Sequence, residues 1–160
     1  MLLPHRGSNL LRMGNERLLR ETEEFFYEKI PITRAMGVRV TKYDGNEFRL
    51  TAPIALNHNH LGTAFGGSLS ALATLAGYGL IWLEMGDKMA HVVIRNSELS
   101  FRRPVREQIE AICRRPSGDE LAMFNNAFAE HHKAKISLDV TIEEEGLVAV
   151  EFRGLFVALR

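Results

Sequence analysis

Hydrophobic residues alternate with polar ones in six segments of this chain, a period that predicts β-strands. The cleanest case is Ile136, Leu138, Val140 and Ile142, which are separated by polar or charged neighbours. The expected strands cover about residues 36–43, 48–52, 91–101, 108–115, 134–144 and 147–159. The first two flank Asp44-Gly45-Asn46, a turn signal that predicts a hairpin.

Helical periodicity marks two further segments. One helix is expected from about Glu16 to Ile30, with Asn15 as its N-cap and Pro31 as its end. The other is expected over 63–85, is apolar on all sides, and stops at Gly86-Asp87.

Two segments resist a firm assignment. Residues 1–15 are broken by Pro4, Gly7 and Gly14 and are expected to form a flexible extension before a single domain over 16–160. Residues 117–132 suit either a short helix or a long loop.

The order of these elements predicts an α+β protein of one particular shape. A helix that is apolar all round must be enclosed, and a curved antiparallel sheet can wrap it. The expectation is a hot-dog fold: a six-stranded, mostly antiparallel sheet around a long central hydrophobic helix. Because one sheet leaves part of such a helix open, pairing into a dimer or higher homo-oligomer is expected as well.

The long apolar helix also invites a membrane interpretation. Residues 61–83 carry no charge and are long enough to cross a bilayer. The run is rich in Gly, Ala, Ser and Thr, however, and no Lys or Arg lies close to its ends to orient it. The amphipathic strands need a helix to cover them, so a buried core helix is favoured.

Charge and cysteine content narrow the functional classes. Twenty basic residues balance twenty acidic ones, which argues against a nucleic-acid or anionic-membrane partner. The lone Cys113 excludes an intrachain disulfide and suits a reducing cytoplasm. Arg6, Arg12 and Arg17 interrupt any apolar core of a signal peptide.

The run 57–68 (NHNHLGTAFGGS), followed by 74–79 (TLAGYG), resembles the hot-dog thioesterase superfamily. More narrowly, it is similar to the putative-thioesterase family typified by the C-terminal domain of the bacterial protein YiiD, over about residues 18–160. That family includes malonyl-ACP decarboxylases, and the resemblance implies a standalone form without the acetyltransferase-like domain. It also implies a substrate carried by acyl carrier protein (ACP) or coenzyme A, and no separate cofactor.

One departure from the superfamily bears on the chemistry. Its hydrolytic members carry an acidic residue about two turns into this helix, and often a histidine just before Gly-Gly. Here Thr74 and Phe65 occupy those places. Hydrolysis needs an activated water or a nucleophile, whereas decarboxylation of a malonyl thioester needs only stabilisation of negative charge on the thioester oxygen.

Asn59 is the first catalytic candidate, because it matches the family's loop asparagine. Asn57 is second and is equally able to hydrogen-bond only its own turn. His60, with His58, suits either an acid–base role or an ordinary loop. A metal pair completed by His131 and His132 is conceivable, but the spacing is no recognised ligand pattern, and no metal is expected.

The helix start is the expected substrate-binding region. Gly66 and Gly67 leave the helix N–H groups uncovered, so that a thioester carbonyl could approach them, or they serve tight packing. Thr63, Phe65 and Ser68 would border the same region, and Thr63 could cap the helix.

Cations for the phosphates of CoA or of phosphopantetheine are expected at Lys133 and Lys135, with several arginines as further candidates: Arg102, Arg103, Arg106, Arg114 and Arg115. Family members enter the fifth strand through a basic Gly-Arg segment, which this chain lacks. Cys113 is expected as a buried small hydrophobe, and Glu98 as a solvated strand residue or a substitute carboxylate.

Three functions stay open at this point. The first is decarboxylation of malonyl-ACP or malonyl-CoA, with Asn59 and Gly67 at the reacting oxygen. The second is an acyl-CoA or acyl-ACP thioesterase with water positioned by Asn59 or His60. The third is a non-catalytic acyl-CoA sensor.

Overall fold

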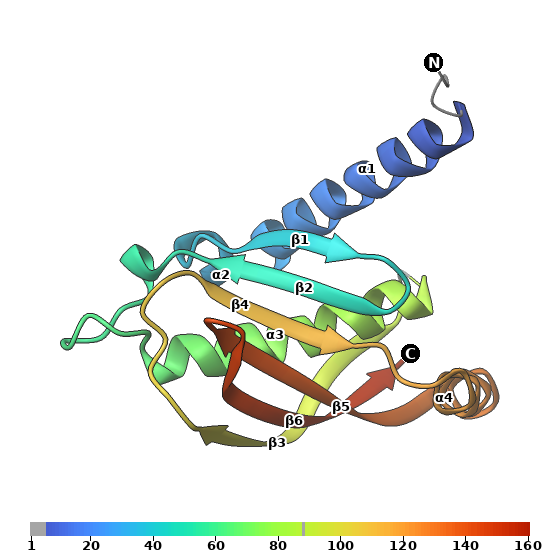
Figure 1. Ribbon diagram of the computed structural model, residues 1–160. Helices are drawn as coiled ribbons and strands as arrows, with labels where there is room; N and C mark the ends of the chain where they lie inside the picture. Colours follow the sequence, from blue (N-terminus) through green and yellow to red (C-terminus); the bar gives the residue numbers. More distant parts are fainter. Residues whose placement is uncertain (1–5, 88) are drawn as a thin grey trace.

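The computed structural model describes residues 6–87 and 89–160, with side chains from residue 14 onward, and has the predicted α+β hot-dog architecture (Figure 1). Its helices are α1 (Arg6–Lys29), α2 (Ile32–Ala35), the 3₁₀ turn η1 (Ile54–Leu56), α3 (Gly66–Met85) and α4 (Gly118–His131). Its strands are β1 (Arg39–Tyr43), β2 (Glu47–Ala52), β3 (His91–Phe101), β4 (Ile109–Arg114), β5 (Lys133–Glu144) and β6 (Leu147–Leu159).

The six strands form one sheet in the order β1-β2-β4-β5-β6-β3, and every neighbouring pair is antiparallel. The predicted alternation holds in β5, where every second residue from Ala134 to Ile142 is buried. The sheet curves around α3, as Figure 1 shows. The strand β3, eleven residues long, forms one edge and pairs only with β6 among the described residues.

Close packing of α3 against aromatic rings depends on two glycines. A Cβ added to Gly77 would lie 2.4 Å from Cζ of Phe156, and one added to Gly79 would lie 2.5 Å from Cε1 of Phe48. The Gly-Tyr-Gly stretch therefore serves helix–sheet packing. In length and hydropathy α3 would suffice to cross a bilayer, but half of its apolar window is buried within the fold.

The first helix differs from its prediction. It begins at Arg6 rather than after Asn15, so residues 6–15 are helical and the expected loose conformation is wrong for them; residues 1–5 lie outside the described residues. Gly7 and Gly14 cost about 1 kcal/mol each in a helix but do not break it, and no proline occurs between Arg6 and Lys29. The first half of α1 projects beyond the sheet (Figure 1).

The structure settles one open assignment and shifts two predicted boundaries. Residues 118–131 form a helix, which a capping box between Ser117 and Glu120 starts. The strand β1 begins at Arg39, because the chain turns through Gly37 at a φ of +66°. The long helix starts at Gly66 rather than at Thr63, which lies in a bend, and the residue just before the helix, Phe65, is extended.

Candidate functional site

Asn57 holds together the two ends of the loop that precedes α3. It is 3% exposed, and its amide nitrogen donates to the carbonyl oxygens of Met36 at 2.8 Å and Pro53 at 2.9 Å. Its own carbonyl accepts the N–H of Phe65 at 2.8 Å. The geometry supports the structural alternative for Asn57: its amide hydrogens are used on buried backbone, so it positions the loop.

Asn59 closes the turn at the tip of this loop. Its Oδ1 accepts the backbone N–H of Leu61 at 2.9 Å and of Thr63 at 3.3 Å, while its Nδ2 donates to Oγ1 of Thr63 at 3.0 Å. Thr63 thus orders Asn59 instead of capping α3, which has no side-chain cap. An amide nitrogen carries two hydrogens, and the second has no acceptor among the described residues. Asn59 is half-buried and keeps one donor available for a ligand.

The first turn of α3 presents unpaired backbone donors. The residue before it, Phe65, is extended, and no acceptor outside the helix is found for the N–H groups of Gly66, Gly67 and Ser68 in the described part of the chain. A twenty-residue helix concentrates partial positive charge at this end. The amide groups and the dipole together suit a developing oxyanion.

Two exposed aromatic rings flank this helix start. The ring of Phe65 packs over Gly67, where an added Cβ would lie 2.3 Å from its Cε1. The ring of Phe101, at the end of β3, lies beside Gly66. Phe65 is 56% exposed and Phe101 57%, which is unusual for phenylalanine and is typical of surfaces that receive a ligand or a partner.

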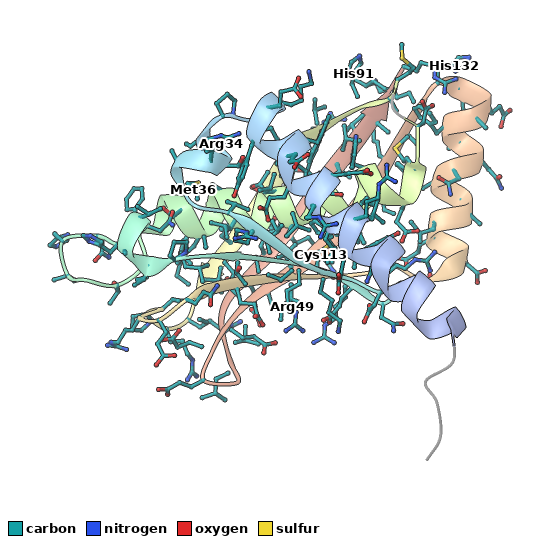
Figure 2. The ribbon with its side chains drawn as sticks, turned by 90° about the horizontal axis from the view of Figure 1, so that it is seen from above. Arg34, Met36, Arg49, His91, Cys113 and His132 are labelled. Carbon is teal, nitrogen blue, oxygen red and sulfur yellow. The ribbon has the colours of Figure 1, made fainter. Side chains whose placement is uncertain are left out.

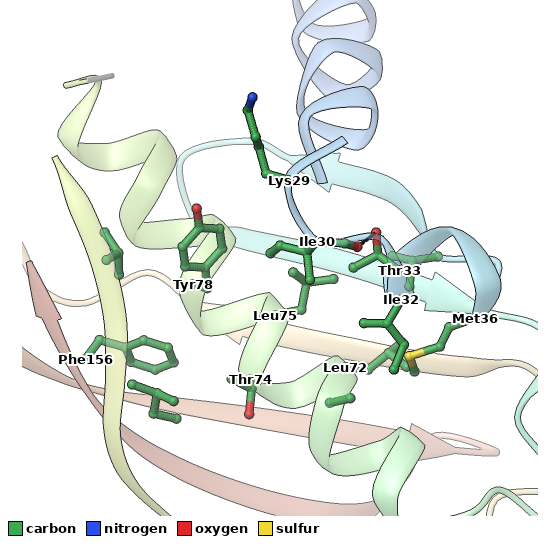
Figure 3. Close-up of a pocket in the computed structure, with 14 residues that line it drawn as sticks. Lys29, Ile30, Ile32, Thr33, Met36, Leu72, Thr74, Leu75, Tyr78 and Phe156 are labelled. Atoms are coloured by element: carbon green, nitrogen blue, oxygen red, sulfur yellow. Dashed lines mark hydrogen bonds between the residues drawn. The ribbon is translucent and has the colours of Figure 1, made fainter. Parts of the chain in front are cut away.

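A mostly apolar hollow lies on the face of α3 that the sheet leaves open. It has a volume of about 460 Å³ and lies between α3, the α1–α2 turn and β3 (Figure 3). Most of its lining is aliphatic or aromatic; the polar lining residues are Lys29, Thr33, Thr74 and Tyr78. Among the described residues that line it, none carries a carboxylate, an imidazole or a thiol. Thr74 is one of these lining residues.

Tyr78 is a pocket residue that sequence analysis missed. It lies one helical turn after Thr74, and Figure 3 shows both side chains at the hollow. Burial raises the pKa of the Tyr78 phenol, so it stays a neutral donor, and its hydroxyl has no hydrogen-bond partner among the described residues. The signal in the sequence was the spacing of four residues from Thr74 on an apolar helix.

The loop and the hollow are separate within one chain. None of residues 57–65 lines the hollow, and Figure 1 shows their loop projecting beyond the sheet past the start of α3. Leu61 at the tip is 74% exposed. The structure therefore brings Asn59 together with Thr63, but not with Thr74.

The other predicted histidines and lysines lie at the far end of the molecule. His132 shares a hollow with Met85 and Asp87, at the C-terminal end of α3. Since α3 has 20 residues, this end lies about 30 Å from Gly66. Lys133 and Lys135 start β5 at the same end, and Figure 2 shows His91 and His132 there together. Neither the lysines nor His131 and His132 are brought to His58, His60 or Gly66 in one chain.

The structure shows one further candidate, Cys113, in the core and another, Glu98, on the surface. Cys113 is fully buried in β4, and burial raises the pKa of its thiol to about 12, which leaves it neutral and unreactive as a nucleophile. Glu98 is exposed on β3, opposite Arg153 of β6, and lines a polar hollow on the sheet separate from the Thr74 hollow. Its expected place on a solvated strand face is confirmed.

Comparison with known proteins agrees with the observed fold. The model of the family described as putative thioesterase (yiiD_Cterm) matches residues 19–160. A protein of unknown function from Chlorobaculum tepidum is 32% identical, with 91% of this chain and 96% of that chain covered and a TM-score of 0.85.

Two similar structures carry a functional description. A putative thioesterase from Shewanella oneidensis is 26% identical, with coverage of 91% and 99% and a TM-score of 0.81. A probable thioesterase from Pseudomonas aeruginosa is 27% identical, with coverage of 88% and 94% and a TM-score of 0.76.

Proposed function

Since this chain belongs to the putative-thioesterase family typified by the C-terminal domain of YiiD, we propose that it decarboxylates a malonyl thioester. The acetyl thioester and CO₂ are the products. The observation that carries this proposal is the lining of the Thr74 hollow, which among the described residues holds no carboxylate, imidazole or thiol to activate a water or attack the thioester. An apolar surround also disfavours a carboxylate and so favours its loss as CO₂.

The negative charge that develops on the thioester oxygen needs donors. The uncapped N–H groups of Gly66 and Gly67 provide two, and the remaining amide hydrogen of Asn59 provides a third. When CO₂ leaves, the electrons of the broken carbon–carbon bond move into the thioester carbonyl, and the resulting enolate takes a proton at carbon. Positioning and charge stabilisation suffice for this step, and no cofactor beyond the phosphopantetheine of the substrate is required.

A second copy of the chain would complete the site. The free edge of β3 exposes the apolar side chains of Val93 and Ile94, and Ile94 also lines the Thr74 hollow. An eleven-residue edge with such side chains is a surface that proteins normally cover. We propose that two copies pair along β3 and bring the loop of one toward the hollow of the other. Sedimentation should then give at least twice the 18.1 kDa chain mass; a monomer at micromolar concentration would refute the pairing.

The carrier is proposed to be ACP or coenzyme A, and the location the cytoplasm, which suits the single unpaired Cys113. The experiment incubates the protein with malonyl-ACP and with acetyl-ACP and follows both by mass spectrometry. Conversion of malonyl- to acetyl-ACP, with acetyl-ACP unchanged, is the expected result.

Hydrolysis is the second candidate, because the family description and two similar structures name thioesterases. In that case Asn59 or His60 would position the water. The same experiment separates the two, since release of free carrier thiol from either substrate would show a thioesterase and refute decarboxylation as the main activity.

A further inference from the structure

A β-bulge interrupts the edge strand β3 near its centre. Two residues of β3 oppose one of β6 there, and Arg95 is the extra residue. The alternation of the strand therefore changes phase: Val92 and Ile94 face α3 before the bulge, whereas Leu99 and Phe101 face it afterwards. By the same alternation Ser97 faces α3, and the residues that face away from it are Val93, Arg95, Asn96, Glu98 and Ser100.

This phase change selects one register for a second copy that pairs along β3. A two-fold axis gives each residue a fixed opposite number in the partner strand, and side chains directly opposite each other must share a face. An axis between residues 95 and 96 meets this condition from 91 to 100. It sets Ile94 opposite the partner's Ser97, Val92 opposite the partner's Leu99 and Val93 opposite the partner's Glu98. Moving the axis by half a residue or one residue in either direction sets an inward side chain against an outward one beside the axis.

The charges on the outer face fit the same register. Arg95 is exposed and has no acidic partner in the described part of the chain. The register places the partner's Glu98 on the diagonal from Arg95, about 7–8 Å away, which long side chains can span. The axis repeats this pair of opposite charges. Matched faces and matched charges together favour a second copy of this chain as the occupant of the β3 edge.

The register joins the two parts of the site that one chain keeps apart. The end of β3 lies on the side of the molecule where α3 begins, and the ring of Phe101 is beside Gly66 (Figure 1). Across the axis the partner's Phe101 lies opposite Ala90 and diagonal to Val92, which lines the Thr74 hollow. This ring therefore lies between the helix start that receives the thioester oxygen and the hollow that receives the acyl group.

We propose that Phe101 of the partner subunit limits the acyl group by excluding a branch at the carbon that becomes the enolate. The hollow does not do so alone, because about 460 Å³ is in the range of pockets that hold ligands much larger than a malonyl unit. A rigid ring beside the reacting carbon leaves less room for a substituent there. This inference rests on the proposed acyl-thioester function and on the pairing along β3.

Cross-linking tests the register without turnover. In Val93→Cys/Glu98→Cys, each new thiol lies directly opposite its counterpart in the partner, within the Cα separation of about 4.4–6.8 Å that a disulfide needs. Oxidation should give a covalent dimer on a non-reducing gel. In Val93→Cys/Ser100→Cys the thiols are out of register by two residues, so this control should stay monomeric on the gel; Cys113 is buried and does not compete. No dimer from the first variant, or equal dimer from both, would overturn the register.

Phe101→Ala tests the role of the ring in turnover. The wild type should prefer malonyl-CoA to methylmalonyl-CoA. Phe101→Ala should raise kcat/KM for methylmalonyl-CoA relative to malonyl-CoA about tenfold, because one carbon in an apolar site changes selectivity by about 10–200-fold. Met123→Ala, which shortens an exposed apolar side chain on α4, should leave the ratio unchanged. An unchanged ratio in Phe101→Ala would refute the proposed role.

Binding separates this inference from the proposed reaction. Ketone analogues of propionyl-CoA and isobutyryl-CoA, in which CH₂ replaces the thioester sulfur, can be neither decarboxylated nor hydrolysed. By calorimetry, Phe101→Ala should tighten binding of the branched analogue relative to the straight one about tenfold; an equal change for both would contradict the inference. If cross-linking and binding give the expected results but neither malonyl substrate is converted, decarboxylation fails and the role of Phe101 stands.

Discussion

The two ends of α3 differ in how their polar groups are hydrogen-bonded. At the N-terminal end the helix begins at an extended Phe65 without a side-chain cap, and the N–H groups of its first turn are unpaired. At the C-terminal end Gly86 turns the chain at a φ of +60°. There Glu84 accepts hydrogen bonds from the Tyr43 hydroxyl at 2.9 Å and from Arg115 at 2.8 Å.

Groups available to a ligand therefore lie at one end of the helix, and groups that stabilise the fold lie at the other. Both ends have histidines nearby in sequence, so residue type alone did not separate them. Among the described residues, only the N-terminal end combines unpaired backbone donors with exposed aromatic rings. The C-terminal end uses its polar groups on one another, which stabilises the fold and leaves little for a ligand.

The largest expected effect on activity is that of Asn59→Asp, in the loop before the N-terminal end of α3. The carboxylate can still accept the N–H groups of Leu61 and Thr63, so the turn persists, but the amide donor is lost. Loss of one such donor costs about 10²–10³ in kcat, which steady-state assays with malonyl-ACP would measure. Thr63→Val, which removes a partner of the turn and keeps the donor, should retain most activity. An equal loss in both variants would assign Asn59 to loop order instead.

Asn57→Ala tests the base of the same loop. Without the amide, the buried carbonyls of Met36 and Pro53 lose a donor, so unfolding free energy should fall by about 1–3 kcal/mol. Urea denaturation measures this loss. Unchanged stability with lost activity would instead give Asn57 the catalytic role considered from its sequence.

Cys113, which lies in β4 toward the C-terminal end of α3, should make the stability of the fold depend on pH. Its thiol pKa rises from 9.0 to about 12, chiefly because of burial. Between these values the unfolded chain has lost the proton and the folded chain keeps it, so stability falls as pH rises, by up to about 1.4 kcal/mol per pH unit. Urea midpoints from pH 9 to 11 should fall more steeply in the wild type than in Cys113→Ala. Parallel slopes would show that the thiol does not titrate in this way.

The smallest effect is expected at Ser117, at the start of α4. Ser117→Ala removes the capping box, in which Ser117 Oγ accepts the N–H of Glu120, and should cost about 1 kcal/mol of stability. Because α4 lies far from the loop end, kcat and KM should not change. A change in KM for malonyl-ACP would show that the C-terminal end of α3 takes part in carrier binding.

Most of the fold was accessible from local patterns. The alternation in 134–144 and 147–159 predicts β5 and β6 almost to the residue, because a half-buried strand must place every second side chain in the core. The spacing of Ser117 and Glu120 matches a capping box and favours the helix over the loop for residues 117–132. Gly7 and Gly14 suggest a break in the N-terminal segment, but a glycine costs a helix only about 1 kcal/mol, whereas a proline also removes a hydrogen bond, so α1 extends back to Arg6.

The sequence by itself determined the order of elements and the apolar central helix. It also determined that position 74 of this helix is a threonine and not an acidic residue. Periodicity is a local property, and each of these follows from residues a few positions apart. Only the tertiary structure decided that Asn57 supports the backbone, that Lys133 starts its strand at the far end of α3, and that Phe101 lies beside Gly66. These relations join segments far apart in sequence, and sheet order and packing, which no local pattern encodes, set the distances between them.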